Sequence, residues 1–213
     1  MNKNLPIFAI ALSLAITVPT VLSQDNSMSF FITSAGPGDG ANLGGIDGAD
    51  AHCQELADAA GAGEKTWKAY LSVSGTNIIN ARDRIGSGPW YNAKGVAIAQ
   101  NLEDLHSENA KTGKGGSLNE KGGEVNGRGD SPNMHDIITG STLNGMAIAG
   151  NGDTTCSNWT NNGEGSARVG HHDRQGGGEN PNSWNSAHGS RGCGQTDLQG
   201  TGGNGLFYCF ATD

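Results

Sequence analysis

Four cysteines are the feature of this sequence that most constrains its fold. Cys53, Cys156, Cys193 and Cys209 all lie beyond residue 23 of a 213-residue chain. An even number of cysteines in an exported protein is typical of a disulfide framework, and four cysteines allow three pairings. A zinc site is the alternative, but no CxxC pair has the spacing that such sites use. We therefore expect two disulfides.

The first residues indicate export. Lys3 is followed by an apolar run over 5–22, and Ser23 ends a short segment that a signal peptidase can read. A membrane-spanning helix is the alternative, but the apolar run is short for a span of about 20 residues and contains two prolines. No other segment is apolar enough to span a bilayer. We expect a signal peptide over 1–23 and a single domain over 24–213.

The composition limits the fold and the partners. With 36 glycines and only 6% aromatic residues, the chain cannot consist mostly of long helices. The formal net charge is −8, and it becomes −9 once Lys3 is removed with the signal peptide. This balance argues against nucleic acid and against an anionic membrane surface as partners, because both repel an acidic protein. It suits cations such as calcium.

Hydrophobic spacing predicts two helices in the first half of the chain. From Asp47 to Gly61, apolar residues recur every three or four positions, with Asp47 able to cap the start and Gly61 able to end the helix. Cys53 then lies on the buried face of this helix. A second helix is expected over 95–106, with its apolar residues on one side.

Short strands and long polar loops account for the remainder. The pattern predicts strands over 29–33, 66–73, 135–139, 145–149, 154–160 and 206–210. Between them, 109–133 and most of 163–205 are polar or glycine-rich and are expected to be loops. The predicted fold class is α+β, with two helices, short and mostly antiparallel strands, and long polar loops.

Four segments resemble the C-type-lectin-like fold, and its endostatin-like branch in particular. The stretch 42–53 is similar to the loop and first helix that carry the first cysteine, and 66–72 is similar to the strand that follows. The stretch 156–160 resembles the endostatin-like Cys-x-x-Trp segment, and 206–209 resembles the closing strand. The resemblance implies two nested disulfides, Cys53–Cys209 and Cys156–Cys193. Secreted bacterial domains share this layout and some are labelled lectins, but the fold hosts many functions.

The calcium-lectin signature is incomplete. Sugar-binding members of that fold use Glu-Pro-Asn or Gln-Pro-Asp, followed by Trp-Asn-Asp before the third cysteine. Here Ser186 follows Trp184-Asn185 where an aspartate is expected. The stretch 179–182 contains Glu, Pro and Asn, but it has an extra Asn and lies too close to Trp184. Sugar binding through calcium is therefore not implied by the resemblance.

The stretch 171–188 contains the densest group of candidate ligand-binding side chains. Those expected to contact a ligand are His171, His172, Asn180, Asn182, Trp184, Asn185 and His188. A calcium ion would use oxygen donors from Asp173, Glu179, Asn180, Asn182 and Asn185. A transition metal would instead use the imidazoles of His171, His172 and His188. The structural alternative is that these side chains only tie the loop backbone to itself.

Two tryptophans are interpreted differently. Trp184, in the polar loop, or Trp159 could stack on a sugar ring, because an aromatic face is an apolar platform beside hydrogen-bonding groups. Trp159 lies three residues after Cys156, a position that favours packing in the core.

Catalysis and integrin-type adhesion are weaker hypotheses. His135-Asp136 and His171-His172-Asp173 could each supply a base and a residue that orients it. No Gly-x-Ser-x-Gly, His-Glu-x-x-His or phosphate-loop motif accompanies them. Arg128-Gly129-Asp130 matches the integrin-binding tripeptide, but it can equally be a turn before the 135–139 strand.

These observations favour a secreted or periplasmic, non-catalytic binding module. The expected partner is an extracellular glycan or a surface or matrix protein, with calcium as the cation that suits the loop. One alternative is an adhesive or structural domain that binds protein, with the 109–133 loop as its contact. A secreted hydrolase is the third.

Overall fold

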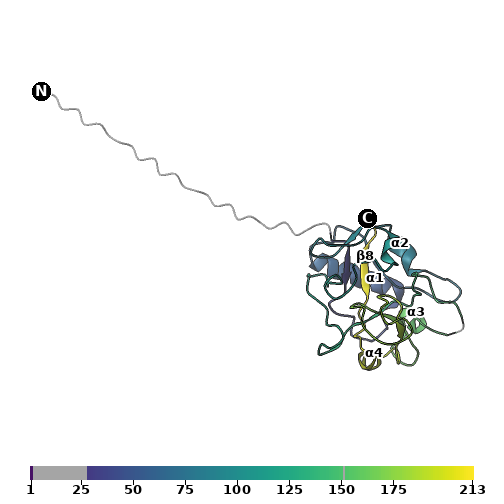
Figure 1. Cartoon of the computed structure of the whole chain (residues 1–213). Helices are drawn as coiled ribbons and strands as arrows, with labels where there is room; N and C mark the ends of the chain where they lie inside the picture. The colour runs from purple at the N-terminus through teal and green to yellow at the C-terminus, as the bar shows by residue number, and fades with distance from the viewer. Residues whose placement is uncertain (2–27, 151) are drawn as a thin grey trace.

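The computed structural model describes residue 1 and residues 28–150 and 152–213, so residues 2–23 of the expected signal peptide lie outside the described residues (Figure 1). The elements follow in the order β1 (Phe30–Ile32), α1 (Gly45–Ala59), β2 (Trp67–Ala69), the 3-10 helix η1 (Ala81–Arg84), β3 (Trp90–Tyr91), β4 (Ala97–Ala99), α2 (Leu102–Leu105), β5 (Asp136–Ile138), α3 (Cys156–Trp159), β6 (Arg168–His171), β7 (His188–Gly189), α4 (Gln195–Thr201) and β8 (Tyr208–Ala211). The α+β prediction is confirmed. Among the described residues, no helix has the length and apolarity needed to cross a bilayer.

A three-stranded antiparallel sheet of order β1-β8-β2 lies at the centre of the fold. Nearly every residue of these strands is buried, because both faces of the sheet are covered. Phe31, Trp67 and Cys209 pack on the face covered by α1, whereas Phe30 and Phe210 belong to a second apolar cluster on the opposite face. Burial on both faces explains why these strands appear in the sequence as continuous apolar runs.

Two nested disulfides fasten this core. Cys53 of α1 is bonded to Cys209 of β8, so one bridge joins the helix to the sheet that it covers. Cys156 of α3 is bonded to Cys193, just before α4. All four cysteines are fully buried and none is free. The pairing implied by the resemblance is confirmed.

A buried carboxylate fixes α1 against β2. Asp50 accepts hydrogen bonds from the Ala69 backbone N–H at 2.9 Å and from the Arg84 guanidinium at 2.7 and 2.8 Å. Lys68 adds an ion pair at 2.9 Å. Because each carboxylate oxygen has a charged or backbone donor, the burial of Asp50 is compensated.

A second antiparallel sheet, of order β5-β6-β7, supports the polar half of the molecule. Its register places Asp136 directly opposite His171, and Val169 opposite His188. Alternate residues of a strand share a face, so Val169 and His171 lie on the same side of β6. The register therefore brings side chains from three strands to one face of this sheet.

Several expected elements differ in the structure. Instead of a helix over 95–106, β4 forms and is followed by the single turn α2. Asn101 caps the start of α2, where its side chain accepts a hydrogen bond from the Asp104 N–H. The prediction of one helix was wrong because Ile98 lies in β4 and Leu105 lies in α2. Both side chains enter the same apolar cluster, so their spacing imitates one helix face. Asp47 lies in the first turn of α1 and does not cap it. The 163–205 region contains β6, β7 and α4 rather than only loop.

The strands expected over 145–149 and 154–160 are also absent from the described chain. Gly145 closes a turn, since its N–H donates to Thr142 and a single bridge joins Ser141 to Ala147. From Cys156 to Trp159 all four φ angles lie between 48° and 68°, a left-handed turn. Non-glycine residues rarely adopt this conformation, so β propensity could not predict it.

Candidate functional site

The residues expected to bind a ligand fall into two neighbouring places. Asn180, Asn182, Trp184 and Asn185 line one cleft. His171 and His188 lie instead in a buried cluster of histidine and aspartate side chains. The loop that joins β6 to β7 contributes to both.

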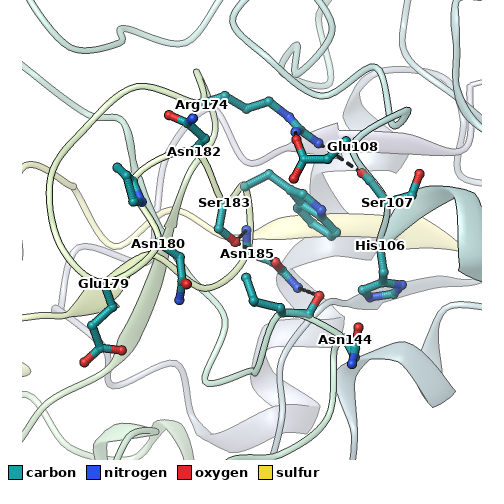
Figure 2. A pocket seen from close by; sticks show the side chains of 13 residues that line it. His106, Ser107, Glu108, Asn144, Arg174, Glu179, Asn180, Asn182, Ser183 and Asn185 are labelled. Carbon is teal, nitrogen blue, oxygen red and sulfur yellow. Dashed lines mark hydrogen bonds and ion pairs between the residues drawn. The ribbon is translucent and has the colours of Figure 1, made fainter.

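The cleft is a polar cavity of about 380 Å³. Figure 2 shows its side chains, which come from three separate segments of the chain. They are His106, Ser107, Glu108, Leu143, Asn144, Arg174, Glu179, Asn180, Pro181, Asn182, Ser183, Trp184 and Asn185. A second cavity, of about 530 Å³, shares Leu143, Asn144, Glu179 and Asn180, so the two cavities adjoin.

Some lining groups hold the walls together and others are free. The Asn185 amide donates to the Tyr70 hydroxyl at 3.0 Å and to the carbonyls of Thr142 and Leu143 at 3.1 and 3.2 Å, so it joins opposite walls. By contrast, Asn144 and Asn182 are exposed, and their side chains make no hydrogen bond to another described residue. A ligand in the cleft would find these two amides unoccupied.

Neither tryptophan offers an open face. Trp184 is 3% exposed, its indole N–H donates to the Leu105 carbonyl at 3.1 Å, and its ring packs on Tyr70. It supports the cleft from beneath. Trp159 is fully buried with its N–H on the Ser72 carbonyl at 2.8 Å, so its expected place in the core is confirmed.

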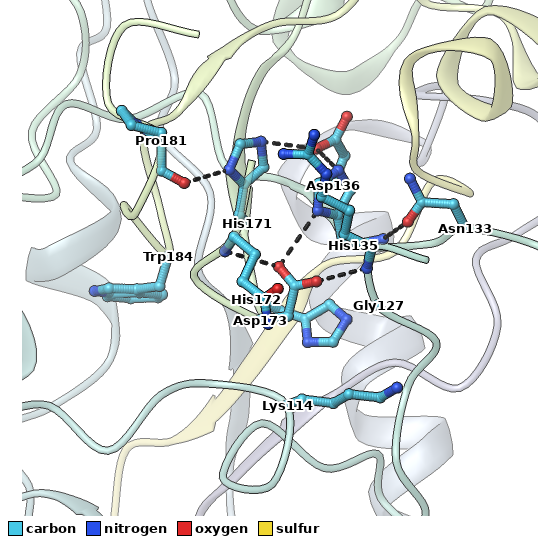
Figure 3. Close-up of polar contacts among 12 residues, drawn as sticks. Lys114, Gly127, Asn133, His135, Asp136, His171, His172, Asp173, Pro181 and Trp184 are labelled. Atoms are coloured by element: carbon cyan, nitrogen blue, oxygen red, sulfur yellow. Dashed lines mark hydrogen bonds and ion pairs between the residues drawn. The ribbon is translucent and has the colours of Figure 1, made fainter. Parts of the chain in front are cut away.

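The buried cluster is centred on Asp136 (Figure 3). Its Oδ1 atom lies 3.3 Å from His135 Nε2, 3.3 Å from His171 Nε2 and 3.6 Å from His188 Nε2. The Nε2 atoms of His171 and His188 are themselves 3.0 Å apart. The exposed fraction is 2% or less for the side chains of Asp136 and His171, and 24% for His188, which forms the outer rim.

The outer nitrogen of each histidine faces an oxygen. His135 Nδ1 lies 3.3 Å from Asp173 Oδ1, and His171 Nδ1 lies 2.7 Å from the Pro181 carbonyl. His188 Nδ1 lies 3.1 Å from the Gly189 carbonyl. An acceptor at Nδ1 places the ring proton there and leaves the Nε2 lone pair directed at the centre of the cluster.

Burial and neighbouring charges shift the pKa values in this cluster. Burial raises the pKa of Asp136 to about 6, against the opposing charges of His135 and His188. Burial lowers the pKa of His171. Burial also acts to lower the pKa of His135. The hydrogen bond with Asp173 and the charge of Asp136 outweigh burial, so the pKa of His135 is raised.

Asp173 is held as a carboxylate. Burial acts to raise its pKa, but hydrogen bonds from His135, the Arg128 N–H and the Gln175 N–H lower it well below the usual range. The Arg128 bond is 2.6 Å long and the Gln175 bond 3.1 Å. Because His135 lies between Asp173 and Asp136, the two histidine–aspartate groups noted in the sequence form a single cluster.

His172 does not join the other imidazoles. Its Nε2 lies 3.1 Å from the Asn126 carbonyl, and its Nδ1 has no hydrogen-bond partner among the described residues. Burial lowers its pKa. It follows β6, where successive side chains point to opposite sides, so it turns away from His171.

Four of the five expected calcium donors have separate partners. Asp173 accepts backbone hydrogen bonds inside the protein, whereas Glu179 is exposed and pairs with Arg168 at 2.6 Å. The amide nitrogen of Asn180 donates to the Ser186 carbonyl. Of the five, only Asn182 has a side chain that makes no hydrogen bond or ion pair with a described residue. The structure therefore does not gather these oxygens around one point.

The Arg128-Gly129-Asp130 tripeptide forms a turn. The Asp130 carboxylate accepts from the Gly127 N–H at 2.7 Å and pairs with Lys114. The Arg128 N–H is bonded to Asp173. The acidic group that an integrin would need is thus already bonded within the chain.

No protein-family model matches the chain, and no curated protein matches it. The site is therefore interpreted from its own geometry. Sequence reasoning did not include Leu143 or Asn144 in the cleft, because they come from a segment remote from 171–188. It noted His135 and Asp136 only as an acid–base pair; the unusual His-Asp pair at the start of a strand was the available signal.

Proposed function

We propose that this chain is an extracellular, non-catalytic binding module that recognises carbohydrate in the cleft between 106–108, 143–144 and 174–185. The observation that carries the proposal is the pair of exposed, unbonded amides, Asn144 and Asn182, beside the exposed side chain of Leu143. Amides both donate and accept, which matches the hydroxyl groups of a sugar. An apolar side chain beside them can cover the C–H face of the ring.

The size and rigidity of the cleft support this proposal. A cavity of about 380 Å³ falls in the range of small-molecule sites, about 300–1,000 Å³. Asn185 joins its walls and Trp184 fills the space beneath it. A preformed cleft loses little conformational entropy when a ligand binds.

The charges at the rim favour a neutral or mixed-charge sugar. Arg174 lies near Glu108 at 3.3 Å, and Glu179 is paired with Arg168. Positive and negative groups therefore alternate around the cleft, and neither sign dominates it. No donor set for calcium is needed for this mode of binding.

The proposal includes a C-type-lectin-like fold exported from the cell. Supporting observations are the nested disulfides and the antiparallel pairing of β1 with β8, which brings the two ends of the domain together. Disulfides persist in oxidising compartments. Protein adhesion and hydrolysis, the two other functions considered from the sequence, are the alternatives to this proposal.

The proposal predicts that a double change, Asn144→Ala with Asn182→Ala, weakens sugar binding. Two lost hydrogen bonds should reduce affinity on the order of 10- to 100-fold, while the fold persists because both side chains are exposed. The measurement is a glycan array followed by calorimetry with the best sugar. Asn77→Ala changes an exposed asparagine outside the cleft and serves as the control.

The wild type and the control should bind the same sugar with equal affinity. Failure of the wild type to bind any glycan, or equal binding by the double variant, would contradict the proposal. Retention of surface or matrix proteins without any glycan binding would point to the adhesive alternative.

A further inference from the structure

Asp136 is a buried carboxylate with an unexplained environment. It is 2% exposed, and neither of its side-chain oxygens accepts a hydrogen bond from a described residue. A buried carboxylate without hydrogen bonds is costly, so such groups are usually paired or bound to a metal. Its immediate neighbours are imidazole nitrogens, not backbone donors.

Those nitrogens present lone pairs to the carboxylate. His171 and His188 both face a carbonyl with Nδ1, so in their neutral forms both Nε2 atoms are acceptors. These two atoms lie only 3.0 Å apart and both face Asp136 Oδ1. Acceptors that converge at such distances repel one another unless a proton or a metal cation lies between them.

The distances agree with a metal ion as that cation. Four ligands around a tetrahedral ion at about 2.0 Å lie about 3.3 Å from one another. Four of the six ligand–ligand distances are 3.0, 3.3, 3.3 and 3.6 Å. His135, Asp136 and His171 can each place one donor atom within 4.8 Å of the other two. His188 joins through Asp136 and His171.

We propose that His135, Asp136, His171 and His188 form a binding site for a divalent transition-metal ion. Three imidazole nitrogens and one carboxylate oxygen suit zinc and its neighbours and do not suit calcium, which prefers oxygen ligands only. The surroundings match those of known metal sites, where the outer nitrogen of each histidine is held by a carboxylate or carbonyl. Here Asp173, Pro181 and Gly189 supply those oxygens.

Two glycines keep the imidazoles in position. A Cβ atom at Gly176 would lie 2.0 Å from His171 Cε1, so the backbone of the loop lies directly against that ring. Gly178 has a φ of 91°, and a Cβ there would lie 2.9 Å from the His188 side chain. The loop is thus shaped around the two rings, as a preorganised site requires.

This metal site is distinct from the proposed sugar site. None of its four ligands lines the cleft, but the loop that lines the cleft also holds His171 through the Pro181 carbonyl. A bound ion would secure the base of that loop. The two proposals involve different side chains, so each can fail without the other.

Calorimetry with zinc alone tests the proposal. The disulfide-bonded protein is stripped with EDTA, titrated with zinc chloride and analysed for retained zinc after gel filtration. Wild type should bind one zinc per chain, and cobalt in its place should give the visible spectrum of a four-coordinate ion. His188→Ala and His171→Ala should lose this binding, whereas His52→Ala, on α1, should retain it.

Asp173→Asn should keep the 1:1 stoichiometry and the cobalt spectrum but lower zinc affinity about 10- to 100-fold, because it acts through His135. His188 is on the partly exposed rim, so its variant is the one best placed to fold, and circular dichroism checks this. Absence of zinc from the wild type, or equal binding by His188→Ala and wild type, would overturn the proposal.

Discussion

Replacing Cys53 and Cys209 together by alanine is expected to lower the free energy of unfolding by about 5 kcal/mol. This bridge closes a loop with a sequence separation of 156 residues, and a long loop gains most entropy when it is released in the unfolded chain. It also joins α1 to the central strand β8, and it is the one disulfide between this helix and the sheet among the described residues. Urea denaturation measures the effect.

The matched comparison is the pair Cys156→Ala and Cys193→Ala. That loop has a separation of only 37 residues, so its loss should cost about 4 kcal/mol. The Cys53–Cys209 variant should therefore be the less stable of the two. A cost below about 1 kcal/mol for the longer loop, or the reverse order, would contradict the role given to the nested bridges.

Asp136→Asn is expected to change stability in opposite directions with and without zinc. In EDTA the free energy of unfolding of the variant should be about 1–3 kcal/mol higher than that of wild type. The reason is that the substitution removes a buried carboxylate that lacks hydrogen bonds. With zinc at a hundredfold excess over the dissociation constant, wild type should gain about 2.7 kcal/mol and the variant nothing. Thermal or urea unfolding in both buffers measures whether the order of stability of variant and wild type reverses when zinc is added.

Asp83→Asn, an exposed aspartate in η1, is the control for this change. Its stability should differ from that of wild type by less than about 0.5 kcal/mol, and it should respond to zinc as wild type does. If zinc stabilises the Asp136→Asn variant as strongly as wild type, the Asp136 carboxylate is not a ligand of the metal.

Local sequence patterns predicted those parts of the fold where one interaction dominates. The spacing of apolar residues around Cys53 predicted α1, and the apolar run before the C-terminus predicted β8. The disulfide pairing followed from the resemblance, since spacing alone left three choices open. These elements form the central sheet and its cover, where burial and secondary structure agree.

Other elements could not be predicted because long-range contacts determine them. Ile98 and Leu105 have helical spacing, yet β4 pairs with β3 and leaves only one turn for α2. The left-handed turn at 156–159 is held by the Cys156–Cys193 bridge and by Asp153, which accepts the Ser157 N–H. Residue propensities take no account of either the disulfide or this hydrogen bond, so they could not predict the turn.

The candidate site was predicted in part. The loop 171–188 was identified, and its asparagines do line a cleft. The metal ligands were divided between two hypotheses, because Asp136 and His171 meet only through the β5–β6 register. His172 was grouped with His171 by adjacency, although the alternation of a strand sends it to the other side. Composition favoured calcium, whereas the geometry gathers nitrogen donors.

X-ray absorption at the zinc edge, combined with anomalous diffraction from crystals of the zinc-loaded protein, tests the metal centre most directly. The account predicts one ion between β5, β6 and β7, with three nitrogen ligands and one oxygen ligand at about 2.0–2.1 Å. The nitrogens should belong to His135, His171 and His188 and the oxygen to Asp136. An ion bound by surface carboxylates, or a zinc-soaked crystal with this cluster empty, would contradict it.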